Sequence, residues 1–104
     1  MEVVIRGHQA ELTDSLKTRA EDGVRKLNDH LRQLVSADVC FAGEGVQKSV
    51  ELIVHAPGNA RLVSKAEAKY HEAALTDAIA KMDAQIRKLK SARKKQVHDT
   101  ELRA

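Results

Sequence analysis

Residues 35–66 read VSADVCFAGEGVQKSVELIVHAPGNARLVSKA, and this stretch decides the fold because apolar and polar side chains alternate along it. The alternation predicts three β-strands, each with one apolar face. In chain order, the residues expected on that face are Val35, Ala37, Val39, Phe41, Val50, Leu52, Val54, Ala56, Leu62, Ser64 and Ala66. The Gly-Glu-Gly segment at residues 43–45 ends the first strand, and the Pro-Gly-Asn turn at residues 57–59 predicts a hairpin between the other two.

Helical periodicity flanks these strands. A short strand is expected at residues 3–7, and Thr13 then suits the N-cap of a helix over residues 14–33. Its apolar stripe consists of Leu16, Ala20, Val24, Leu27, Leu31 and Leu34. A second helix is predicted over about residues 70–95, with Leu75, Ile79, Met82, Ile86 and Leu89 on one face. The sequence thus predicts an α+β fold in the order β-α-β-β-β-α, a four-stranded sheet with two helices packed on one face.

The chain has 104 residues, 42% hydrophobic and 32% charged, which suits one globular domain. We expect residues 1–95 to form that domain and residues 96–104 to be a flexible C-terminal tail. No apolar run approaches the roughly 20 residues of a membrane span, and the N-terminus does not resemble a secretory signal. The lone Cys40 cannot form an internal disulfide. The sequence therefore predicts a cytoplasmic protein with no membrane partner.

The net charge of +3 is unevenly distributed along the chain. Residues 81–95 hold seven Lys or Arg and one acid, Asp83, whereas the remaining residues carry a net charge of −3. The following cations fall in the half of the second helix opposite its apolar stripe: Lys81, Arg87, Lys88, Lys90, Lys94 and Lys95. Such a run is usually a solvated surface, but a helix that is merely solvated carries more acids for i,i+4 pairing. This charge asymmetry favours a polyanionic partner.

Folded RNA is the polyanion that best suits this composition. Phe41 and Tyr70 are the only aromatic residues, which argues against a base-stacking platform. Contact should therefore run through phosphates, 2′-hydroxyls and shape. The five histidines lack metal-ligand spacing, and no paired acid and base or activated nucleophile is evident. We expect no enzyme activity, no metal and no cofactor.

Several segments resemble the ribosome hibernation-promoting factors, also called ribosome-associated inhibitors or sigma-54 modulation proteins. The segments are IRG at residues 5–7, ELTDSL at 11–16, KL at 26–27, AAL at 73–75 and KMDAQIRK at 81–88, the last being similar to a Lys-Leu-x-x-Gln-Leu-x-Lys core. The resemblance spans residues 3 to about 95. It implies a double-stranded-RNA-binding-like fold that docks in the decoding region of the small ribosomal subunit and blocks messenger and transfer RNA during stationary phase or stress.

The resemblance also implies a set of RNA-binding residues. Lys26, Lys81 and Lys88 carry over position by position, and the basic segment is extended by Arg87, Lys90, Lys94 and Lys95. Gly23 stands where the family usually has a lysine, and Arg25 is the candidate substitute. Tyr70-His71-Glu72 replaces the family's Asp-Met-Tyr, and Ala74-Leu75-Thr76 replaces its Ala-Ile-Asp. These departures affect the expected contacts more than the fold.

The chain resembles the short form of the family, without the C-terminal dimerisation domain. We therefore expect a monomer off the ribosome, and ribosome pairing would require a separate pairing factor. An alternative of a different class is a non-ribosomal interaction module whose basic helix binds an acidic protein or another structured RNA. The dependence of binding on salt separates the two, because phosphate contacts weaken steeply and log-linearly with salt concentration.

Overall fold

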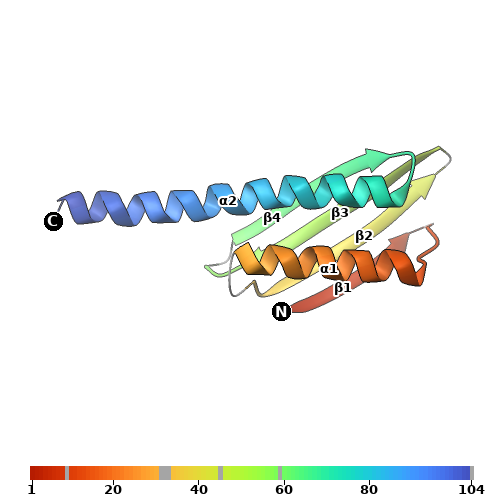
Figure 1. Ribbon diagram of the computed structural model, residues 1–104, viewed down its shortest axis with the longest axis horizontal. Coiled ribbons are helices and arrows are strands. Elements are labelled where there is room, and N and C mark those ends of the chain that lie inside the picture. Colours follow the sequence, from red (N-terminus) through yellow and green to blue (C-terminus); the bar gives the residue numbers. More distant parts are fainter. Residues whose placement is uncertain (9, 31–33, 45, 59, 104) are drawn as a thin grey trace.

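The computed structural model describes residues 1–8, 10–30, 34–44, 46–58 and 60–103, with the backbone alone at residues 29–30, 44 and 90–103. Its elements are β1 (Glu2–His8), α1 (Asp14–His30), β2 (Ser36–Glu44), β3 (Gln47–Ala56), β4 (Ala60–Ala68) and α2 (His71–Arg103). The predicted α+β order β-α-β-β-β-α is confirmed (Figure 1).

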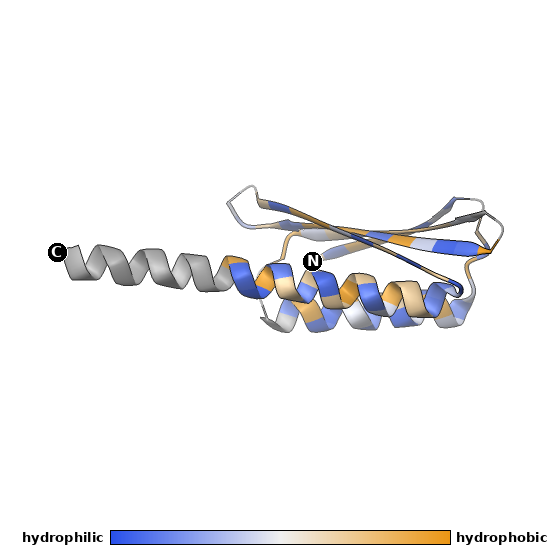
Figure 2. Ribbon diagram, turned by 90° about the horizontal axis from the view of Figure 1, so that it is seen from above, coloured by the Kyte–Doolittle hydropathy of each residue, from blue (hydrophilic) through white to orange (hydrophobic). Residues whose placement is uncertain are grey.

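The four strands form one sheet in the order β1-β2-β3-β4. β1 is parallel to β2, and the two following pairs are antiparallel. Both helices lie on the same face of this sheet, as predicted, and they run in the same direction (Figures 1 and 2). Within the described residues, neither helix is long and apolar enough to cross a membrane. The fold therefore has one covered face, one open face and two edge strands, β1 and β4.

The core lies between the sheet and the helices. The strand register pairs Val39 with Leu52 and Phe41 with Val50, and all four side chains are fully buried. Burying one such side chain contributes about 1.5–3 kcal/mol to folding. The helices cover this layer with the side chains of Leu16, Ala20, Val24, Leu27, Ala74, Leu75, Ala78, Met82 and Ile86. The alternation and helical stripes predicted from the sequence therefore meet in a single core.

Val35 is an exception to the predicted strand pattern, because its side chain is 60% exposed. β2 begins one residue later, at Ser36, and the neighbouring Leu34 is buried instead. Adjacent residues of an extended chain point to opposite sides, so only one of the two can enter the core. Leu34 is held there by its backbone N–H, which donates to Asn28 Oδ1 at 3.1 Å.

One helix end differs from the prediction. Thr13 caps α1 as expected, since its Oγ1 accepts a hydrogen bond from the Leu16 backbone N–H at 3.2 Å. α1 is described as far as His30, and residues 31–33 of the predicted helix, with Leu31 of its stripe, lie outside the described residues. α2 continues to Arg103 instead of ending near residue 95. Residues 91–103 contain no Gly or Pro to break it, and the flexibility of residues 96–104 stays a prediction.

Gly23 is explained by the contact between the two helices. A Cβ atom at this position would overlap the Cδ1 atom of Ile79. Glycine lowers helix propensity by up to about 1 kcal/mol relative to alanine, but here it lets the Ile79 side chain lie directly against the α1 backbone. The helices are therefore matched by size, with the smallest residue of one opposite a branched residue of the other.

This contact predicts coupling between positions 23 and 79. In the Ile79→Val background the overlapping Cδ1 atom is absent, so Gly23→Ala should be more favourable there than in the wild type, by about 0.5 kcal/mol or more. Urea unfolding of the wild type, the two single variants and the double variant measures the difference. Equal effects of Gly23→Ala in both backgrounds would contradict the contact.

Candidate nucleic-acid interface

Positive charge is concentrated in residues 81–95 of α2, which hold seven Lys or Arg and one acid. Acidic residues begin both helices, Asp14 in α1 and Glu72 in α2, whereas Lys26 and Lys88 lie further along them. A helix dipole favours negative charge at its N-terminus and positive charge at its C-terminus. Because α1 and α2 run in the same direction, Lys26 near the end of α1 lies on the side of the helical layer from which the basic part of α2 projects (Figure 1). α1 as a whole, however, carries four Lys or Arg and four Asp or Glu. That side of the helical layer is the candidate nucleic-acid interface.

Lys26 lies on a shallow groove between the helices. The groove is lined by Arg19, Asp22, Gly23 and Lys26 of α1 and by Glu72, Leu75, Thr76 and Ile79 of α2. Arg19 and Lys26 are seven residues apart, so they lie on the same flank of α1. Between them, Gly23 has no side chain to fill the groove. The α1 wall of the groove thus presents two exposed cations, Arg19 and Lys26. Each helix also contributes one acidic residue to the groove, Asp22 of α1 and Glu72 of α2.

Arg25 does not replace the missing side chain at position 23. Residues two apart on a helix point in nearly opposite directions, since each residue turns the chain by about 100°. Arg25 accordingly lies outside the groove and forms an i,i+4 ion pair with Glu21 at 3.9 Å. Arg19, one turn before Gly23, is the cation that lies on the same flank of α1 as Gly23. Sequence reasoning missed Arg19, although its seven-residue spacing from Lys26 was the available signal.

Lys81 lies on the flank of α2 that faces the edge of the sheet. Its side chain is exposed, but its Nζ donates a hydrogen bond to the Lys65 carbonyl of β4 at 2.9 Å. The sequence placed Lys81 on the half of α2 away from the core, and the structure places its ammonium group against a neighbouring strand. A phosphate contact by Lys81 would compete with this hydrogen bond.

Arg87 and Lys88 differ in how freely they can meet a polyanion. Arg87 Nε lies 3.0 Å from Asp83 Oδ2 in an i,i+4 ion pair, with its side chain 67% exposed. A guanidinium has five N–H donors, so the remaining donors still face solvent. Lys88 is exposed and makes no hydrogen bond or ion pair with the described residues. Among the candidate cations whose side chains are described, Lys88 and Lys26 are therefore the two without such a contact to the described residues.

Lys90, Lys94 and Lys95 belong to the part of α2 described by its backbone alone, so their side-chain contacts lie outside the described structure. They follow Lys88 on an unbroken helix that has passed beyond the sheet (Figure 1). The structure therefore places the seven predicted cations on two parallel helices. Their role in RNA binding stays a prediction.

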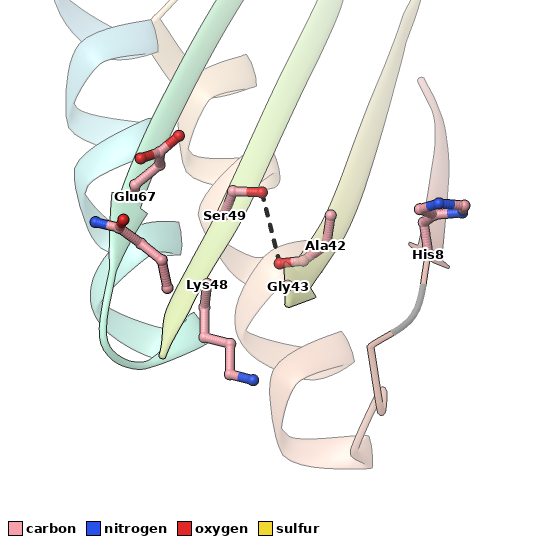
Figure 3. Close-up of a pocket in the computed structure, with 7 residues that line it drawn as sticks. His8, Ala42, Gly43, Lys48, Ser49 and Glu67 are labelled. Carbon is pink, nitrogen blue, oxygen red and sulfur yellow. Dashed lines mark hydrogen bonds between the residues drawn. The ribbon is translucent and has the colours of Figure 1, made fainter. Parts of the chain in front are cut away.

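The open face of the sheet carries a hollow of mixed charge. Figure 3 shows its lining of His8, Ala42, Gly43, Gln47, Lys48, Ser49 and Glu67. The floor consists of small residues, and Ser49 Oγ donates to the Ala42 carbonyl at 3.5 Å. Among the described residues no group of three or more His, Cys, Asp or Glu is placed to hold a metal ion. Neither the hollow nor the half-buried Cys40 suggests catalysis.

These features define a class of protein: a small α+β domain with a four-stranded sheet, covered on one face by two parallel helices of which the second carries a basic segment. The chain belongs to the sigma 54 modulation protein / S30EA ribosomal protein family, whose sequence model matches residues 3–94. A ribosome hibernation promoting factor from Azotobacter vinelandii is 32% identical over 90 residues, which cover 86% of this chain and 83% of that protein. The resemblance drawn from the sequence is thereby confirmed.

Solved structures share the fold. A ribosomal subunit interface protein from Coxiella burnetii superposes with a TM-score of 0.81 at 18% identity, covering 88% of this chain and 99% of that one. The N-terminal domain of Thermus thermophilus Protein Y gives a TM-score of 0.78 at 22% identity, covering 86% of this chain and 99% of that one. At these identities the likeness establishes the fold alone. The double-stranded-RNA-binding-like description stays a prediction.

The groove predicts that the position of a cation on α1 affects polyanion binding more than its charge alone. Arg19→Gln and Lys17→Gln remove the same charge from the same turns of α1, but Lys17 is not among the groove residues. On an immobilised-heparin column, Arg19→Gln should elute at lower salt than Lys17→Gln, because Arg19 and Lys26 lie on one flank of α1 and can contact the same polyanion, whereas Lys17 lies outside the groove. Identical elution of the two variants would contradict polyanion binding at the groove.

Proposed function

We propose that the protein is a ribosome-binding hibernation factor that acts by occupying the ribosome. The observation that carries this proposal is the basic, projecting part of α2, beside the parallel helix α1, in a chain of this family. A hibernation-factor relative at 32% identity supports the ribosome as the partner. In this proposal the protein acts in the cytoplasm, as a monomer when off the ribosome.

The basic helices are proposed to meet ribosomal RNA of the small subunit at the decoding region. Each Lys or Arg that neutralises a phosphate releases condensed counterions, which gives affinity without reading the base sequence. The 14 residues of α2 that follow Leu89 extend the helix by about 20 Å, and they carry Lys90, Lys94 and Lys95. Such a projection suits insertion between RNA elements.

Inhibition follows from occupancy rather than from chemistry. A domain seated in the decoding region excludes messenger and transfer RNA from the same space, and the bound ribosome is held idle in stationary phase or stress. No catalytic group is needed for this mechanism. Pairing of two ribosomes is assigned to a separate factor, because the proposal gives this domain one ribosome-binding surface.

The first prediction from this proposal concerns location. At low salt the protein should co-sediment with purified small subunits on a sucrose gradient, and at high salt it should move to the top of the gradient. The apparent binding constant should fall log-linearly with salt, because phosphate contacts release counterions. Binding that ignores salt, or a protein found free at every salt concentration, would contradict the RNA-docking mechanism and leave an acidic protein partner as the better candidate.

The second prediction concerns the projecting part of α2. Reversing Lys88 and Lys95 to Glu should leave the free energy of unfolding within about 0.5 kcal/mol per site, since exposed substitutions have small effects. Binding to small subunits should fall sharply, and inhibition of cell-free translation should weaken in parallel. The salt slope should drop by roughly one unit per lost contact.

The matched control is the double variant Arg61→Glu, Lys65→Glu, which makes the same charge change on the open face of the sheet. These two residues are exposed and alternate along β4 with side chains that face the helices. The control should bind and inhibit nearly as the wild type does. An equal loss in both double variants would show that total charge, and not the helical layer, governs binding.

A further inference from the structure

Three polar contacts join α2 to β4 along one edge of the sheet. Ser64 Oγ of β4 donates to the Ala78 carbonyl of α2 at 2.8 Å. In the opposite direction, Lys81 Nζ donates to the Lys65 carbonyl at 2.9 Å, and Gln85 Nε2 donates to the Val63 carbonyl at 2.6 Å. Figure 1 shows β4 at the edge of the sheet, beside the first half of α2.

The two side chains from α2 reach carbonyls that the sheet leaves without a partner. β4 pairs with β3 on one side only. Alternate carbonyls of an edge strand point away from the sheet and form a template on which another strand can pair. Lys65 and Val63 are two residues apart, so their carbonyls point the same way, and both accept hydrogen bonds from α2. Lys81 and Gln85 therefore close this part of the edge.

The spacing of the contacts fixes the register of the helix on the strand. Lys81 and Gln85 are four residues apart, a rise of about 6.0 Å along a helix. Lys65 and Val63 are two residues apart, a rise of about 6.6–6.8 Å along a strand. The numbers run in opposite directions because α2 is antiparallel to β4. Rotating α2 about its axis would break both hydrogen bonds together.

We infer that Lys81 and Gln85 are positioning residues, which hold α2 at the rotation that turns Lys88 and the following cations towards RNA. The inference rests on the proposed function, and it assigns Lys81 a different role from the phosphate contact that the sequence implied. Lys81 and Gln85 are the Lys and Gln of the segment KMDAQIRK. The four-residue spacing of that motif is thus the spacing that the β4 edge requires.

Lys81 and Gln85, the two side chains of α2 that donate to the β4 edge, are called the brace. The test compares its charged member, Lys81, with its uncharged member, Gln85. Lys81→Met and Gln85→Leu each remove one hydrogen bond while keeping an apolar stem. Each variant should lower the Tm by about 2–4 °C, the effect of one largely exposed hydrogen bond in a domain of this size. At a temperature where both variants are fully folded, each should weaken binding to purified small subunits by a similar factor, with the salt slope unchanged.

Lys88→Met is the matched control, because it removes the same charge seven residues along the same flank of α2. It should leave the Tm unchanged and lower the salt slope by about one unit, as a phosphate contact does. The inference would be overturned if Lys81→Met gave that same result, or if Gln85→Leu left ribosome binding unchanged. A loss of Tm in both brace variants without any loss of binding would reduce their role to stability and would also overturn it.

Failure of the proposed function gives a different result. In that case the wild type and Lys88→Met would both fail to bind small subunits at every salt concentration, whatever the Tm of the brace variants. With wild-type binding intact, the comparison between Lys81→Met and Gln85→Leu decides the inference alone.

Discussion

The packing of α2 against the sheet is the interaction on which the rest of the structure depends. Ala74 and Ala78 are small and fully buried, so the helix backbone approaches β4 closely enough to accept a hydrogen bond from Ser64. The Ser64 hydroxyl is buried, and a buried polar group needs such a partner. Met82 and Ile86 continue the same seam further along the helix. This seam sets the height and direction of α2 over the strands.

The basic surface follows from how far that seam extends. The apolar stripe of α2 ends near Leu89, but the helix continues to Arg103 because its sequence contains no residue that breaks it. Burying unpaired lysines would cost several kcal/mol each, so the cations occupy the outer flanks and the projecting part. α1 runs in the same direction and adds Arg19 and Lys26 beside the groove. The candidate interface is therefore built by both helices.

Most of the architecture was predictable because each element has its own periodicity. Alternation in residues 35–66 and the 3.6-residue stripes of the helices led to the observed element order. The prediction of buried side chains was wrong where two adjacent apolar residues could occupy the same place in the core. Val35 and Leu34 are adjacent and both apolar, and the structure puts Leu34 in the core and leaves Val35 exposed. The predicted end of α2, near residue 95, was wrong because residues 96–104 are mixed and polar and were expected to form a tail, whereas α2 continues to Arg103.

The sequence by itself determined the strands, the helices and the concentration of positive charge in residues 81–95. It could not determine which neighbour each flank of a helix meets, because periodicity gives an angle about the helix's own axis and nothing beyond it. Only the tertiary structure places Lys81 and Gln85 against the edge of β4, Arg19 beside Gly23 in the groove, and Arg25 outside it. The physical reason is that these contacts depend on how two elements are oriented relative to each other, and that orientation is set by packing across the whole core.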